Sequence, residues 1–155
     1  MFPAAYFITW SCYGARLHGD SRGSVDRDHN AYNTPLLPAS EPAQSRDRRQ
    51  MPEEPFVLSA EGQRIVRETV AAHTEYRRWE LLIVNVRTNH VHLVVSARLA
   101  PESVMGQYKA WTSRRLREAG VLGNRTKVWT PHGSTKYLWT IEDTRDAVHY
   151  ARNLQ

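Results

Sequence analysis

Cysteine is almost absent from this sequence, and so are long apolar runs. Cys12 is the only cysteine among 155 residues, so the chain can form neither an internal disulfide nor a cysteine-rich zinc site. This scarcity is typical of a reducing compartment, and we expect a cytoplasmic location. No apolar stretch approaches the ~20 residues of a membrane-spanning helix, and the N-terminal segment lacks the pattern of a signal peptide. We therefore expect no membrane partner.

Acidic residues are outnumbered by basic ones. The chain has 21 Lys and Arg against 16 Asp and Glu, a net charge of +5, which favours a polyanionic partner such as nucleic acid. Hydrophobic residues make up 41% and charged residues 24%, which excludes a wholly disordered chain. The length predicts a single domain over residues 1–155.

Residues 15–55 show neither helical nor strand periodicity. They contain five of the eight prolines, together with many Ser, Asp and Asn residues, and this composition predicts a long loop insertion. This segment contains six arginines and seven acidic residues, so its charges nearly cancel and it does not have the charge of a simple basic DNA-binding arm.

Hydrophobic periodicity predicts four strands and three helices in the rest of the chain. Ser59 and Thr140 are expected helix N-caps, Pro101 an expected first helical residue and Gly120 an expected helix end. The expected strands are 6–13, 81–86, 90–97 and 136–140, and the expected helices are 59–79, 101–119 and 141–155. Without the last helix, this β-α-β-β-α-β order predicts an α+β, ferredoxin-like fold, an antiparallel sheet with helices on one face. A C-terminal helix follows it.

The most specific local pattern is His90-Val91-His92, within an expected strand. Residues two apart in a strand point to the same face, so both imidazoles project side by side with Cα atoms about 6–7 Å apart. Two such imidazoles can share a metal ion, although the pair also fits an ordinary polar sheet edge. Further ligands would come from His73, His132, His149, Asn153 or Gln155.

The last predicted helix carries Tyr150, followed by two amides. At about 100° per residue, Asn153 lies about 60° from Tyr150 around the helix and Gln155 about 140°. Spacing alone therefore places Asn153 nearer to the face of Tyr150. A tyrosine at such a position also fits a core residue.

In combination these features resemble the single-tyrosine HUH transposases, in which HUH denotes histidine, hydrophobic residue, histidine. That family includes insertion-sequence transposases of the single-strand type and REP-associated tyrosine transposases. Residues 17–27 resemble an insertion found in one branch of it. The resemblance is carried by Thr9-Trp10, Thr88 to Val95, Val104 to Leu116, Val128-Trp129-Thr130, Lys136 to Thr140 and Ala147 to Tyr150.

This resemblance implies an enzyme that cleaves and rejoins single-stranded DNA by transesterification. Tyr150 would be the nucleophile that forms a 5′-phosphotyrosyl link. His90, His92 and Gln155 would bind a divalent ion, Mg²⁺ or Mn²⁺. Many members carry the third ligand four residues after the tyrosine, where this chain has Leu154, so Asn153 is the alternative to Gln155. A homodimer and DNA with hairpin or palindromic ends are also implied.

Basic residues after the histidine strand are the expected DNA contacts: Lys109, Arg114, Arg115 and Lys127. Exposed aromatic residues could add base stacking, for which the candidates are Trp111, Trp129, Tyr137 and Trp139. Two other functions fit the same sequence. One is a single-stranded nucleic-acid-binding module without catalysis, and the other is a metal-dependent phosphodiesterase that uses water as nucleophile.

Overall fold

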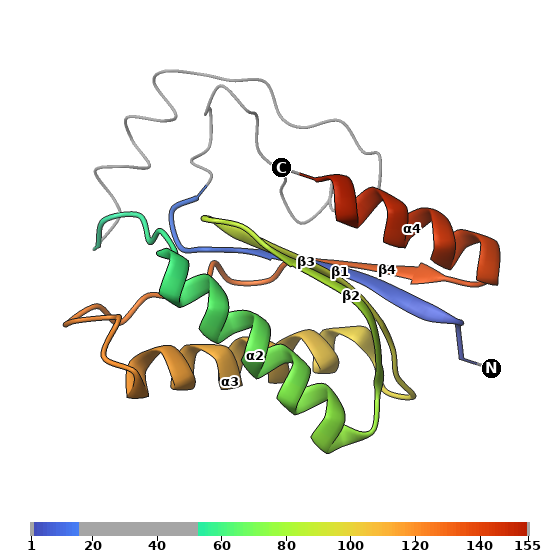
Figure 1. Ribbon diagram of the computed structural model, residues 1–155, viewed down its shortest axis with the longest axis horizontal. Coiled ribbons are helices and arrows are strands. Elements are labelled where there is room, and N and C mark those ends of the chain that lie inside the picture. The colour runs from blue at the N-terminus through green and yellow to red at the C-terminus, as the bar shows by residue number, and fades with distance from the viewer. Residues whose placement is uncertain (1, 16–52, 155) are drawn as a thin grey trace.

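The computed structural model describes residues 2–15 and 53–154 and has the predicted α+β architecture (Figure 1). Four antiparallel strands form one sheet in the order β2-β3-β1-β4, which is the ferredoxin-like arrangement. The elements are β1 (Ala5–Ser11), α2 (Ala60–Arg77), β2 (Glu80–Val86), β3 (His90–Ser96), α3 (Pro101–Glu118), β4 (Ser134–Leu138) and α4 (Ile141–Asn153).

The sheet is covered by helices on both faces. Helices α2 and α3 pack against one face, and α4 lies across the other (Figure 1). The larger core lies under α2 and α3 and includes Trp10, Leu93 and Tyr108. A smaller core lies under α4, where Phe7 and Val94 pack against Ala147. Because β3 is buried from both sides, its apolar residues do not alternate with polar ones at its centre.

The predicted helix starts are confirmed, whereas α2 ends at Arg77 rather than at residue 79 and α4 at Asn153 rather than at residue 155. The Ser59 hydroxyl accepts a hydrogen bond from Gly62 N at 3.0 Å, and the Thr140 hydroxyl accepts one from Asp143 N at 3.0 Å. Pro101 opens α3, and Gly120 follows that helix with a φ of +76°, in the left-handed region that glycine tolerates.

Some local expectations differ from the structure. Strand β4 begins at Ser134 rather than Lys136, because its pairing with β1 already starts at the Thr9–Ser134 pair. Strand β1 ends at Ser11 rather than at residue 13. The predicted loop at 15–55 falls mostly outside the described residues. Among the described residues, no helix is long and apolar enough to cross a membrane.

Gly133 brings the loop before β4 into close contact with the sheet. A Cβ at this position would lie 2.6 Å from the Thr9 carbonyl oxygen and 2.7 Å from Met105 Sδ. This close approach of the loop to Thr9 and Met105 explains why residue 133 is glycine, because any side chain there would push β4 away from β1. By contrast, Gly106 lies within α3 with nothing within 4 Å of such a Cβ.

Gly133→Ala is expected to destabilise the fold by about 1–3 kcal/mol through overpacking against backbone. Gly106→Ala is the matched control and should stabilise it by about 0.5–1 kcal/mol, because alanine is the better helix former. Urea denaturation followed by circular dichroism measures both changes. Equal stability of the two variants would contradict the close-approach explanation.

Candidate functional site

Polar side chains form a row across the sheet face that α4 partly covers. His92 on β3 is paired with Asn85 on β2 and with Thr9 on β1, and Thr9 is in turn paired with Ser134 on β4. His90 lies two residues along β3 and is paired with Ser11. The small core under α4 lies on the same face and includes Phe7, Val94 and Leu138, so the polar row marks the end of this core.

The two histidines lie close together, as the sequence predicted from their spacing. Their ring centroids are 4.5 Å apart and their planes meet at 71°. His90 Nδ1 donates to Asn89 Oδ1 at 2.6 Å, and His92 Nδ1 shares a hydrogen bond of 2.9 Å with the Thr9 hydroxyl. An amide oxygen only accepts, so the neutral His90 ring carries its proton on Nδ1 and its lone pair on Nε2.

This arrangement fits the requirements of a metal site. Histidine ligands usually bind a metal through one ring nitrogen while the other is held by a neighbouring polar group. Asn89 and Thr9 supply such groups here, and both imidazoles are half-buried. A pair of nitrogens oriented in this way would bind a divalent cation through Nε2.

Tyr150 lies on the same face of the sheet as the histidines. Its ring packs against Phe7 with a centroid separation of 5.9 Å, and the Phe7 ring also lies 6.2 Å from the His92 ring. Tyr150 is 45% exposed, so it is not locked in the core. The alternative of a buried structural tyrosine does not apply.

The C-terminal end of α4 is held over the polar row by two side chains. Asn85 Nδ2 donates to the carbonyl oxygens of Ala151 at 2.7 Å and Leu154 at 3.2 Å. The Arg87 guanidinium donates twice to the Leu154 carbonyl, at 3.1 and 2.5 Å. These carbonyls have no partner within the helix, and a cation is also favourable at the negative end of the helix dipole. Asn85 and Arg87 therefore fix α4 on the sheet of its own chain.

The third metal ligand is not defined by the described residues. Gln155 lies outside them. Asn153 is exposed, and its amide nitrogen donates to the His149 carbonyl within α4 at 2.9 Å. His73 is buried between α2 and α3, where Nε2 contacts Gln107 Oε1 at 2.7 Å. In residues 2–15 and 53–154, no cluster of three or more His, Cys, Asp or Glu side chains could hold a metal.

The basic residues predicted to contact DNA belong to α3 and the loop after it, across the sheet from the histidines. Lys109 is half-buried, and its ammonium donates to the Thr130 and His132 carbonyls at 2.8 Å each. Burial lowers the pKa of Lys109 below the usual lysine value. Its contacts give Lys109 a structural part in holding the loop before β4.

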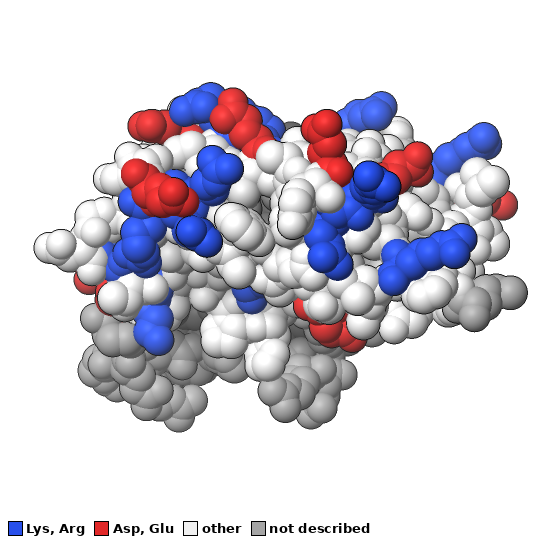
Figure 2. All heavy atoms as spheres, turned by 90° about the horizontal axis from the view of Figure 1, so that it is seen from below, with Lys and Arg blue, Asp and Glu red and all other residues white. Residues whose placement is uncertain are grey.

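The other predicted DNA contacts are exposed. Arg114 lies over the Trp111 ring at 5.1 Å and near Glu118 at 3.7 Å, while Arg115 and Lys127 face solvent. On the face formed by α2 and α3, basic and acidic side chains are interspersed (Figure 2). This face therefore does not present a single positive field.

Of the aromatic candidates for stacking, three are exposed: Trp111, Tyr137 and Trp139. Trp129 is only partly exposed, since its Nε1 donates to the Lys109 carbonyl at 3.1 Å and its edge meets the Trp10 ring.

Sequence reasoning missed the side chains that position the site, which are Phe7, Thr9, Asn85, Arg87 and Asn89. Asn89 could have been found, because it directly precedes His90. The other four depend on strand register and on where α4 docks, which no local pattern reveals.

Comparison with known families is consistent with this arrangement. A family model described as IS200-like transposase matches residues 52–143, more than half of the chain. The chain belongs to the IS200-like transposase family. The matched segment contains the two histidines of the site and ends before Tyr150, which the docking of α4 brings to them. Among proteins with curated descriptions, none matches this sequence.

Two solved structures share the fold of this transposase family member. One is a protein from Deinococcus radiodurans assigned as a transposase, with 13% identity, a TM-score of 0.54, and coverage of 99% of this chain and 92% of the other. The second is a REP-associated tyrosine transposase bound to a REP hairpin, with 13% identity, a TM-score of 0.51, and coverage of 97% and 66%. At this identity the likeness concerns the fold alone.

Replacing both holding side chains, Asn85→Ala with Arg87→Ala, is expected to loosen the last turns of α4. Two carbonyls would lose their donors, which corresponds to about 1–3 kcal/mol of local stability. Hydrogen exchange of the α4 amides, read by mass spectrometry, should accelerate while exchange in β3 changes little. Arg67→Ala, at an exposed position on α2, is the control. Unchanged exchange of the α4 amides in the double variant would refute the role of Asn85 and Arg87 in holding the helix.

Proposed function

We propose that this transposase cleaves and rejoins single-stranded DNA with Tyr150 as the nucleophile. The observation that carries the proposal is the shared packing of Tyr150 and His92 on the Phe7 ring. It brings a half-exposed phenol and two oriented imidazoles to one face within a single chain. Such a set suits phosphoryl transfer to a tyrosine, and membership of the family supports DNA as the substrate.

In the proposed reaction, the Tyr150 oxygen attacks the phosphorus of a DNA phosphodiester after losing its proton to solvent. The bond from phosphorus to the 3′ oxygen breaks, and that oxygen takes up a proton to leave a free 3′-OH. The product is a 5′-phosphotyrosyl link, which retains the energy of the phosphodiester. A second 3′-OH can then displace Tyr150 and rejoin the strand without ATP.

His90 and His92 would hold a divalent cation, Mg²⁺ or Mn²⁺, and Gln155 is our proposed third ligand. Such a cation would supply Lewis acidity to the non-bridging oxygens of the phosphate. Support for Gln155 over Asn153 comes from Leu154, whose carbonyl is bound by Asn85, the cross-strand neighbour of His92. The Asn153 amide is instead engaged with α4 itself.

The proposal extends to the partners of the protein. The substrate would be cytoplasmic single-stranded DNA with hairpin or palindromic ends, as in the hairpin-bound REP-associated tyrosine transposase of similar fold. A homodimer is also proposed. Since α4 docks on its own sheet, Tyr150 would reach the histidines of the same chain. Lys109, Arg114, Arg115 and Lys127 remain proposed DNA contacts on the far face.

Tyr150→Phe is expected to abolish formation of a covalent protein–DNA adduct on a hairpin-containing oligonucleotide with Mn²⁺. The phenyl ring keeps the packing on Phe7 but lacks the attacking oxygen, so folding should be unaffected. Denaturing electrophoresis of labelled DNA measures the adduct, and Tyr76→Phe on α2 is the matched control with full activity. Metal-dependent cleavage that persists in Tyr150→Phe would instead establish a hydrolase. Binding without any cleavage would establish a non-catalytic module.

Thr9→Val should weaken Mn²⁺ binding by about 10-fold or more, because His92 Nδ1 would lose the hydroxyl that orients the ring. His92→Ala should remove measurable binding, and a chelator should stop adduct formation. Calorimetric titration with Mn²⁺ checks these affinities. Thr135→Val, on β4 but on the sheet face toward α2 and α3, is the control; an equal loss there would mean that the effect is not specific to the histidine pair.

A further inference from the structure

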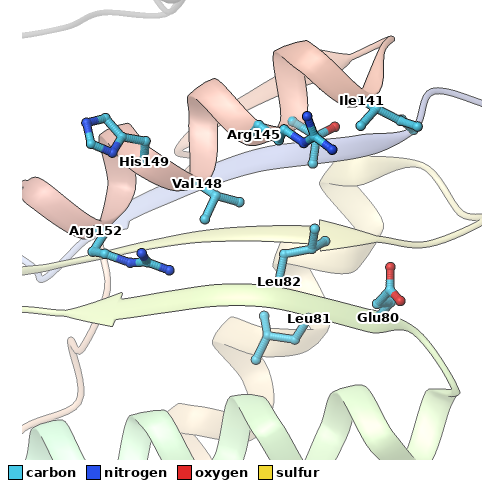
Figure 3. A pocket seen from close by; sticks show the side chains of 10 residues that line it. Glu80, Leu81, Leu82, Ile141, Arg145, Val148, His149 and Arg152 are labelled. Atoms are coloured by element: carbon cyan, nitrogen blue, oxygen red, sulfur yellow. The ribbon is translucent and has the colours of Figure 1, made fainter.

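A groove runs along α4 on the flank that faces away from Tyr150. It has a volume of about 630 Å³ and lies between α4 and the edge strand β2 (Figure 3). Arg145, Val148 and Arg152 line it from the helix, and Leu81 and Leu82 line it from the strand. The volume falls within the range of pockets that hold nucleotide-sized groups.

The floor of the groove is apolar because of an irregularity in β2. The pairing of β2 with β3 shifts register between Leu81 and Ile83, which leaves Leu82 as an extra residue in the strand. Leu82 is 39% exposed and lies in the groove across from Val148. These two aliphatic side chains offer a surface against which flat groups such as bases can pack.

One wall of the groove carries two arginines. Ile141, Arg145, Val148 and Arg152 follow each other at spacings of four, three and four residues, so they share one face of α4. Arg145 and Arg152 are about 10 Å apart along the helix axis, so they can contact different phosphates of one strand. Both arginines extend from α4 in Figure 3.

These two arginines take part in no ion pair with another described residue. Across the described part of the chain, ion pairs join Arg64 to Glu68, Arg114 to Glu118, and Arg125 to Glu53. Neither Arg145 nor Arg152 takes part in one. The acidic groups nearby are Glu80 on the opposite wall and, on α4 itself, Glu142, Asp143 and Asp146, of which Glu142 is three residues before Arg145.

We infer that this groove binds a short stretch of single-stranded DNA, on the other flank of α4 from the segment that Tyr150 attacks. Arg145 and Arg152 contact the phosphates, and bases pack against Leu82 and Val148. The groove lining has two arginines against one carboxylate, Glu80, which favours a polyanion as the occupant, and the apolar floor favours unpaired bases over duplex backbone. The inference rests on the proposed function only for taking this DNA to be part of the cleaved strand, because strand binding itself requires no chemistry.

Fluorescence anisotropy with a labelled, unstructured oligonucleotide in chelator tests the inference without cleavage. Arg145→Ala with Arg152→Ala should raise the Kd by at least about 10-fold and lower the slope of log K against log salt by about 1.4, the value for two lost phosphate contacts on a single strand. Arg64→Ala with Arg67→Ala on α2 makes the same charge change on the other face and is the matched control. Thermal melting of both double variants confirms that they fold.

Glu80→Gln supplies a test in the opposite direction. Removing the acid from the groove should tighten binding about two- to fivefold and steepen the salt dependence, as expected for less repulsion of phosphate. Unchanged affinity in the Arg145/Arg152 variant, or equal losses in the α2 control, would overturn the inference. So would a variant that binds DNA normally but changes the monomer–dimer equilibrium in sedimentation, since the groove would then be a contact between copies.

The two proposals fail in different ways. If the wild-type protein forms no Tyr150 adduct but the arginine variant still loses strand affinity, the groove inference stands and the proposed reaction falls. If the adduct forms normally and the arginine variant binds and reacts like the wild type, the reaction stands and the groove inference falls.

Discussion

The site depends on a sheet that is buried on both faces. Strand β3 packs Leu93 and Val95 under α2 and α3, and packs Val94 under α4. Polar side chains on the α4 face are tolerated only where that helix leaves the sheet partly open, which is where His90 and His92 lie half-buried. Partial burial weakens competition from water, so hydrogen bonds from Asn89 and Thr9 can define the orientation of each ring.

Docking of α4 is the second requirement, and it is achieved with little apolar surface. The helix buries only small side chains, Thr144, Ala147 and Ala151, which allow a close approach to the sheet. Short helices have little stability of their own, so the contacts that bind their ends matter more. Asn85 connects both halves of the site, because it binds the end of α4 and is also the cross-strand neighbour of His92. Movement of the helix end is thereby coupled to the strand that carries the imidazoles.

The fold could be predicted from local patterns, because periodicity and caps are encoded within a few residues. Ser59, Pro101, Thr140 and the pair His90 and His92 all have the structural setting that their sequence context indicates. The partners of the histidines could not be predicted in this way. Thr9 is separated from His92 by 83 residues, and their contact exists only because β1 and β3 pair in one register.

The contacts of charged side chains are the feature that the sequence predicts least well. Counting lysines and arginines on the helix after β3 singled out Lys109, yet its ammonium is occupied by two backbone carbonyls and its pKa is lowered by burial. Arg87 likewise acts on the end of a helix. Basic side chains attract a polyanion only where they are not already engaged in ion pairs or with backbone carbonyls, and this depends on packing. On the described surface, Arg145 and Arg152 on the α4 flank take part in no ion pair, whereas the mixed charges over α2 and α3 largely offset one another.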